Sequence, residues 1–332
     1  MTAEKVATGG FVVGRAAGDA WWWLAIRWVG VAGTFVLLWG LFASPDLTLK
    51  IWWNLVVPLL PISFLISASM WRAVCPLASF NTAGNGLLSR RSVTARGIER
   101  AGLIGVLLLA ILVPARRFVF NADGTVLGVV IVAVILVAFL LGTVFDLKAG
   151  FCNSICPVLP VERLYGQHPL FEIKNPRCPT CTACTGKGCI DLSPEKSIAQ
   201  VLGPTRRSYD WLSQSFGAFA ATFPGAVFAY FSLVDGNLSS AGIVYLTIAV
   251  GAVASYVLTQ ILVRLFKIPA GVAIACLAGV AIGVYYWFVT PAMVSTVGLD
   301  AGIFALRAVL LGVVVWWMWR ALRIELNKGK PE

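Results

Sequence analysis

The residues most able to do chemistry are the cysteines. Six of the eight cysteines, and the single histidine His168, lie between residues 152 and 189. Within this segment Cys178, Cys181 and Cys184 form a CxxCxxC run. At this spacing three thiolates bind three irons of a 4Fe–4S cluster, and a remote cysteine, typically followed by proline, supplies the fourth ligand. The sequence therefore predicts at least one 4Fe–4S cluster.

Two cysteines are followed by proline, and their surroundings are related. WRAVCPLASF, residues 71 to 80, aligns with CNSICPVLPV, residues 152 to 161. Cys75 then matches Cys156, and Trp71 stands where the second copy has Cys152. We interpret the two stretches as an internal duplication of a helix pair followed by a CP motif, with one cysteine replaced in the first copy.

Seven cysteines are candidate cluster ligands. By analogy with ferredoxins, one cluster would use the CxxCxxC run and one CP cysteine. A second would use Cys189, Cys152 and the other CP cysteine, and its missing ligand would be His168. The alternative for His168 is an ordinary surface or interface histidine. Cys276 lies within an apolar run, so we expect it to be a buried structural thiol. The candidate ligands are Cys75, Cys152, Cys156, Cys178, Cys181, Cys184 and Cys189.

The rest of the chain is strongly hydrophobic. Of its 332 residues 59% are hydrophobic and only 12% are charged. Several uncharged runs reach the roughly 20 residues that a helix needs to cross a bilayer. Continuous apolar runs exclude the alternating pattern of a barrel. We expect an all-α polytopic membrane protein with about eight transmembrane helices, at 21–44, 52–69, 101–120, 125–145, 213–233, 241–262, 270–292 and 302–319.

Three regions follow from this pattern. Residues 1–145 contain four helices and a first CP-motif loop at 70–100, and residues 213–332 contain four more helices and a tail. Residues 146–212 between them form a Cys-rich loop with a small ferredoxin-like insert. The insert has too few apolar residues for a core, so we expect a metal to fold it. The first 20 residues lack the features of a secretory signal, so the first span should be retained.

Basic residues give the orientation. Of the 26 Lys and Arg, 21 fall on the side that holds both termini and both CP motifs. Basic loops stay in the cytoplasm, so this side is predicted to be cytoplasmic. That compartment is reducing, which disfavours disulfides. The net charge of +11 is thereby explained without nucleic-acid binding.

The combination of CxxxCP after a span and a later CxxCxxC resembles the NapH- and NosR-type membrane polyferredoxins. The resemblance covers roughly residues 50–192 and depends on the motifs quoted above. It implies a bacterial cytoplasmic (inner) membrane protein that transfers electrons within an oxidoreductase complex. The chain departs from the family pattern in four ways. One CxxxCP lacks its first cysteine, one CxxCxxC stands where two are common, four residues rather than three precede Cys189, and four further spans follow.

The function that we expect is electron relay through one or two 4Fe–4S clusters at the cytoplasmic face. A single histidine excludes a bis-histidine haem made from this chain alone. Electrons therefore enter and leave on the cytoplasmic side, or a partner carries them across. The expected partners are membrane lipid and a ferredoxin or flavodoxin. Two alternatives stay open: an enzyme subunit that reduces or oxidises a quinone, and a zinc-stabilised scaffold or transporter.

Overall fold

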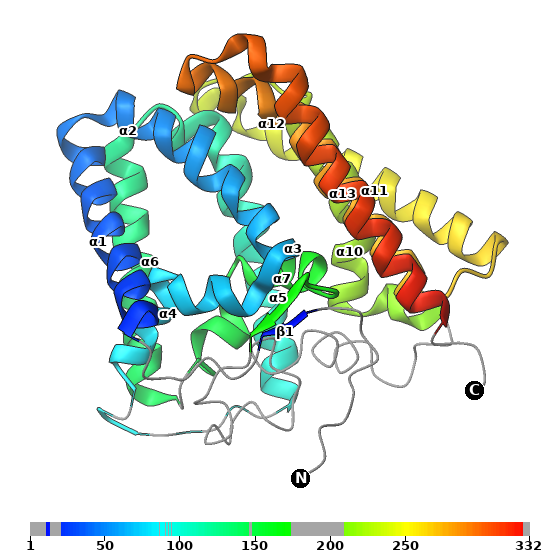
Figure 1. Ribbon diagram of the computed structural model, residues 1–332, viewed down its shortest axis with the longest axis horizontal. Helices are drawn as coiled ribbons and strands as arrows, with labels where there is room; N and C mark the ends of the chain where they lie inside the picture. Colours follow the sequence, from blue (N-terminus) through cyan, green and yellow to red (C-terminus); the bar gives the residue numbers. More distant parts are fainter. Residues whose placement is uncertain are drawn as a thin grey trace.

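The computed structural model describes residues 11–13, 21–85, 87–89, 91, 93, 95–145, 148–173 and 209–327, nearly all of them in helices (Figure 1). The first half has α1 (Trp21–Ala43), α2 (Pro45–Ile51), η1 (Trp52–Val56), α3 (Val57–Val74), α4 (Pro76–Ala83), α5 (Ala95–Ala115), η2 (Arg116–Phe120), α6 (Gly124–Val144), η3 (Phe151–Ile155) and α7 (Leu159–Tyr165). The second has η6 (Tyr209–Ser213), α10 (Ser215–Phe231), η7 (Leu238–Ser240), α11 (Ala241–Leu265), α12 (Ala270–Val297), η8 (Asp300–Gly302) and α13 (Ile303–Asn327). Strands β1 (Phe11–Val13) and β2 (Phe171–Ile173) pair in parallel.

The expected polytopic helical architecture is confirmed. Seven helices in the described part of the chain are long and apolar enough to cross a membrane. The predicted span at 213–233 corresponds to α10, which has 17 residues and is shorter than the others. At 1.5 Å per residue α10 is about 26 Å long, slightly less than a hydrocarbon core of about 30 Å. Seven of the eight predicted spans thus correspond to helices of sufficient length, and the eighth, α10, is shorter than a full-length span.

The start of α1 and the end of α13 lie on the same face of the molecule. The N-terminal strand β1 pairs with β2, which follows the second CP motif. In the last turns of α13, Trp317 and Arg320 donate hydrogen bonds to the carbonyl of His168, close to β2. We call this face the CP face, and the opposite side the far face.

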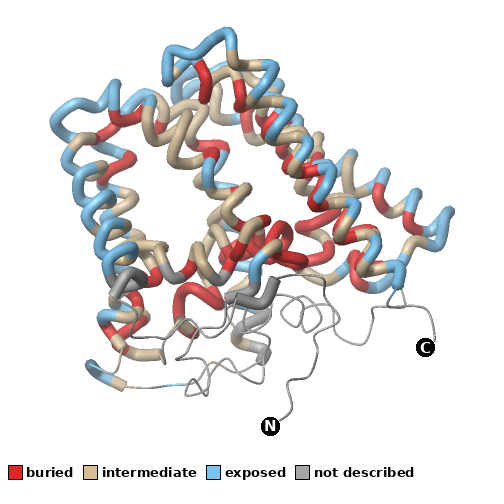
Figure 2. The backbone as a smooth tube through the Cα atoms, viewed as in Figure 1, coloured by how far each residue is buried: buried red, intermediate tan, exposed pale blue. Residues whose placement is uncertain are grey.

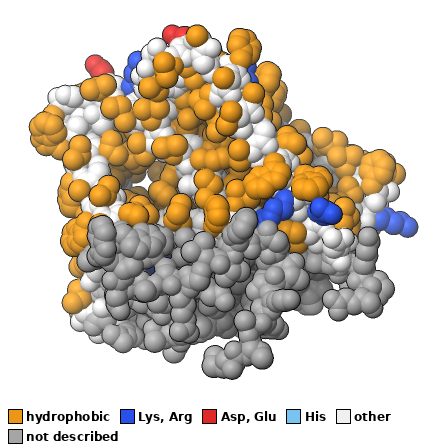
Figure 3. Space-filling view, in the orientation of Figure 1, with side chains coloured by type: hydrophobic (Ala, Val, Ile, Leu, Met, Phe, Trp, Pro, Cys, Tyr) orange, Lys and Arg blue, Asp and Glu red, His pale blue; other side chains and the backbone are white. Residues whose placement is uncertain are grey.

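The outer surface of the helices is apolar. Side chains such as Trp39 and Phe304 are 73% and 82% exposed. Figure 3 shows hydrophobic side chains covering most of the described surface, with a few Lys and Arg where that surface ends toward the CP face. Exposure of this much apolar area in water would drive aggregation, so the surface suits a lipid environment.

The main core lies where α7, α10, α12 and α13 meet (Figure 2). Small residues allow close helix approach there, as is common in membranes. Gly225 on α10 faces Gly251 and Ser255 on α11 so closely that a Cβ at Gly225 would collide with the Gly251 carbonyl. In α12, Gly279 packs against Met318 of α13, whereas a Cβ at Gly283 would meet open space.

Helix α3 is broken at Ser67, which is 1% exposed and has φ −166° and ψ 107°. Its Oγ accepts a hydrogen bond from the amide of Met70 at 3.3 Å, as an N-cap does for the turn that follows. The break frees the carbonyl of Leu65, which accepts a hydrogen bond from the amide of Leu170 at 3.0 Å. The break thus anchors the segment between α7 and β2 to α3.

Candidate functional site

The two CP motifs form the same backbone turn. Cys75, between α3 and α4, has φ −54° and ψ 123°, and Cys156, between η3 and α7, has φ −56° and ψ 123°. Proline disfavours the helical region for the residue before it, and both cysteines lie outside that region where their helices end. This agreement supports the internal duplication inferred from the sequence.

The copies differ in the turn that precedes the cysteine. The amide of Cys75 donates to the carbonyl of Trp71, four residues back, as in an α-helix. The amide of Cys156 donates to the carbonyl of Phe151, five residues back, which makes η3 a π-helical turn. Such turns are often found at functional sites. Here the π-turn holds Cys152, which is buried.

Each copy packs its second, short helix against the other copy. Helix α4 lies on α6, and α7 lies on α3. Asn81, six residues after Cys75, donates from Nδ2 to the carbonyl of Ala138 on α6 at 2.6 Å. Glu162, six residues after Cys156, pairs with Arg72 on α3. This exchange of helices brings the two CP turns together.

Cys75, Cys152 and Cys156 consequently converge. Cys152 belongs to a buried cluster with residues of α4, α6 and η3, and the other two cysteines pack against that cluster. The three thiols are close enough to influence one another's ionisation. At the position of Cys152 the first copy has Trp71, whose ring packs edge-on against Phe64 at 5.9 Å between centroids. The structure therefore groups three of the seven predicted ligands.

Two glycines let membrane helices approach the CP turns. A Cβ at Gly30 on α1 would lie 2.6 Å from the carbonyl oxygen of Val74, and one at Gly105 on α5 would lie 3.0 Å from that of Cys156. Val74 immediately precedes Cys75, so each glycine faces the corresponding turn of its own copy. The duplication thus includes a glycine on the helix that begins each pair.

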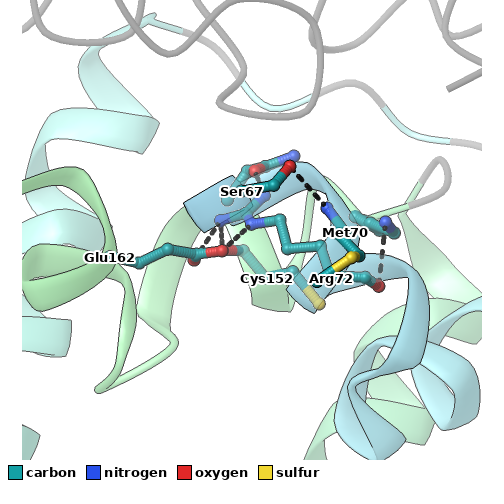
Figure 4. Close-up of polar contacts among 7 residues, drawn as sticks. Ser67, Met70, Arg72, Cys152 and Glu162 are labelled. Atoms are coloured by element: carbon teal, nitrogen blue, oxygen red, sulfur yellow. Dashed lines mark hydrogen bonds and ion pairs between the residues drawn. The ribbon is translucent and has the colours of Figure 1, made fainter. Parts of the chain in front are cut away.

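Arg72, in the last turn of α3, joins the two copies through a buried network (Figure 4). Its Nε lies 2.7 Å from Glu162 Oε1, and its Nη2 lies 2.9 Å from Glu162 Oε2. The same Nη2 donates to the carbonyl of Cys152 at 3.0 Å, and Nη1 donates to Oδ1 of Asn153. Arg72 and Asn153 stand three residues before Cys75 and Cys156, so equivalent positions of the two copies contact each other.

Burial makes all three thiols hard to ionise. Loss of hydration raises the pKa of Cys75, raises that of Cys152 well above its usual value, and raises that of Cys156 to about 12. The guanidinium of Arg72 acts in the opposite direction on Cys152 and Cys156. A metal binds the thiolate, so its positive charge would have to replace the hydration that these thiols lack.

The donor set is incomplete within the described residues. There, no group of three or more His, Cys, Asp or Glu is arranged to hold a metal ion. The predicted ligands Cys178, Cys181, Cys184 and Cys189, and the ferredoxin-like insert that carries them, lie outside the described part of the chain. A 4Fe–4S cluster distributes its thiolates over several irons. The buried thiol of Cys152 and the half-buried thiols of Cys75 and Cys156 fit part of such a set.

His168 is buried at an interface between the segment after α7 and α13. Its Nε2 lies 3.0 Å from Glu325 Oε1, and its carbonyl accepts hydrogen bonds from Trp317 at 2.9 Å and Arg320 at 3.0 Å. The interface alternative therefore describes its surroundings. Its use as an iron ligand stays a prediction.

Glu162 has a bidentate partner, Arg72, that lies 90 positions away in sequence. The sequence signal that could have indicated this pair is the alignment of the two copies, in which Arg72 precedes Cys75 by three residues and Glu162 follows Cys156 by six.

Comparison of the chain with protein-family models, with curated proteins and with solved structures gave no match.

Proposed function

We propose that this chain is a membrane electron-transfer protein that holds one or two 4Fe–4S clusters at its CP face. The observation that carries the proposal is the convergence of Cys75, Cys152 and Cys156. Two motifs about 80 residues apart in sequence would not need to bring their thiols together for packing alone. When bound, such a cluster accepts and releases one electron at a time.

The described residues have defined roles in this proposal. The thiols of the two CP turns act as ligands, and the CxxCxxC run with Cys189 supplies the others. Apolar residues of α4, α6 and η3 pack around Cys152 and limit the access of water to the CP turns. A dry surrounding and nearby backbone amides are means by which proteins adjust the potential of a cluster.

We further propose that the CP face is cytoplasmic and that the protein resides in a bacterial inner membrane. The support is the excess of Lys and Arg on this side. A one-electron donor protein such as a ferredoxin or flavodoxin would then reach the cluster from the cytoplasm, and the basic loops would attract its acidic surface. The acceptor is a protein or quinone of the same membrane.

Anaerobic purification followed by iron, zinc and acid-labile sulfide analysis tests the proposal. We expect about four or about eight irons per chain with matching sulfide, and an EPR signal after dithionite reduction. Cys156→Ser should lose iron and change the signal. The matched control is Cys276→Ser on α12, whose thiol is distant in sequence from every motif and should leave both unchanged.

Zinc without sulfide would contradict the iron–sulfur proposal and favour the scaffold alternative. Reoxidation of the reduced protein by an added quinone analogue would distinguish a quinone-linked subunit from a relay to another protein. In that experiment the readout is the loss of the EPR signal under strict exclusion of air.

A further inference from the structure

The buried ion pair between Arg72 and Glu162 is the most unusual polar feature of the described residues near the CP turns. Both side chains are nearly inaccessible, with 3% and 4% of their surface exposed. The guanidinium makes two bonds to the carboxylate and a third to the backbone of Cys152 (Figure 4). A buried pair of this kind gains little over well-packed apolar side chains, because both charges lose their hydration.

The position of this ion pair indicates a role beyond structural stabilisation. Arg72 belongs to the first copy, three residues before Cys75, and its side chain contacts Cys152 of the second copy. Glu162 approaches from the opposite side, six residues after Cys156. Fixed charges of opposite sign therefore stand next to the backbone of Cys152, in a surrounding that water screens little.

The two charges act differently on the thiols. Arg72 places a positive charge against the backbone of Cys152, to whose carbonyl its Nη2 donates at 3.0 Å, whereas Glu162 places a negative charge on the short helix that follows Cys156. A group that stabilises negative charge on the sulfurs also stabilises a cluster that has gained an electron. A carboxylate near the sulfurs destabilises the reduced cluster, because both are negatively charged.

Building on the proposed function, we infer that Arg72 and Glu162 are positioning residues that set the reduction potential of the cluster at the CP turns. One electron from a low-potential donor makes the cluster more negative by one charge, and no bond is formed or broken. Arg72 stabilises that charge and raises the potential. Glu162 holds the guanidinium in place and partly offsets its charge.

The test is an EPR-monitored redox titration of the full chain, purified anaerobically, with iron counted in every sample. Glu162→Gln keeps the shape of the side chain and leaves Arg72 uncompensated, so the midpoint potential should rise. Arg72→Gln removes the cation and leaves Glu162 uncompensated, so it should fall. The double variant Arg72→Gln with Glu162→Gln should return toward the unmodified protein.

Arg117→Gln and Asp235→Asn are the matched controls, because this ion pair, with an Nη1–Oδ1 distance of 2.6 Å, lies at the far face. Neither should move the potential. A merely structural role for Arg72 and Glu162 would lower iron content or thermal stability and would not give shifts of opposite sign.

If Arg72→Gln fails to fold, the midpoint potentials of Glu162→Gln and of the double variant still test the inference. An unchanged potential in Glu162→Gln, or a double variant shifted as far as Glu162→Gln, with iron retained in both, would overturn the inference while leaving the proposed function intact. A metal-free unmodified protein would instead contradict the proposed function, and the inference with it.

Discussion

His168 and Glu325 are joined by a buried ion pair or hydrogen bond, with 3.0 Å between Nε2 and Oε1, although 157 positions separate them in sequence. The contact ties the segment that leads from the second CP motif toward the Cys-rich insert to the last turn of α13. The four C-terminal helices, which carry no recognisable motif of their own, thereby help to place the segment that enters the insert.

This contact predicts that His168 stabilises the protein by anchoring that segment. His168→Gln should lower the unfolding midpoint in detergent, because it leaves Glu325 buried with a poorer partner at a cost of about 1–3 kcal/mol. Glu325→Gln should have a similar effect, although it leaves the imidazole in place. Neither should change iron per chain. Loss of iron in His168→Gln alone would show that the ring is a ligand.

The close approach of α1 to the first CP turn gives a second prediction. In Gly30→Ala the new Cβ would lie 2.6 Å from the backbone carbonyl of Val74, which cannot move aside as a side chain can. We expect a loss of about 1–3 kcal/mol in stability and reduced iron content. Gly33→Ala, one turn further along α1, meets no atom within 4 Å and should be neutral. Equal behaviour of the two variants would contradict the packing described for α1.

Most of the helical framework could be predicted, because the length of each apolar run of residues can be read from the sequence. The predicted span at 125–145 differs from α6 by only one residue at each end. The break of α3 at Ser67 was missed, since the surrounding residues remain apolar and no proline marks the site. It is stabilised by Leu170, a contact that local sequence does not reveal.

Helix packing was predicted less well than helix position. Gly279 and Gly283 have the GxxxG spacing that is typical of a packing face between membrane helices, but of the two only Gly279 closely approaches a neighbouring helix. The closest approach between α10 and α11 uses Gly225 and Gly251 instead. A glycine in an apolar helix shows where close approach is allowed, and only the partner helix decides where it happens.

The candidate site was predictable as a set of residue types. Alignment of the CP motifs predicted the equivalence of Cys75 and Cys156, which share one backbone conformation. The exchange of short helices between the copies was not predictable, because Arg72 and Glu162 are far apart in sequence and each has nearer charged neighbours.

The N-cap at the α3 break gives a third prediction. Ser67→Ala removes the hydroxyl that accepts from the amide of Met70, and should cost about 0.5–2 kcal/mol. Ser63→Ala is the matched control, because the Ser63 hydroxyl bonds only to the Leu60 carbonyl, three residues back in its own helix. Thermal unfolding in detergent measures both. A larger effect for Ser63→Ala would contradict the N-cap role of Ser67.

The last prediction concerns α10, whose 17 residues fall below the length of the other spans. Its two ends nevertheless meet opposite faces. Near its start, the carbonyl of Leu212 accepts from Tyr256, and Trp211 and Leu212 pack in the core with Leu164 and Tyr165 of α7, which follows the second CP motif.

At its other end, the carbonyl of Tyr230 accepts from Arg117, in the turn between α5 and α6 on the far face. A short helix can cross if the bilayer thins locally or its flanking residues reach the interface. We therefore expect α10 to traverse the membrane despite its length. An alkaline phosphatase reporter fused after Asn237 should be active outside the cytoplasm, and a fluorescent protein fused after Asn327 should fluoresce inside it. A first fusion that is expressed but inactive would mean that α10 re-enters on the CP face, because the reporter needs disulfides that do not form in the cytoplasm. The chain would then have an odd number of crossings.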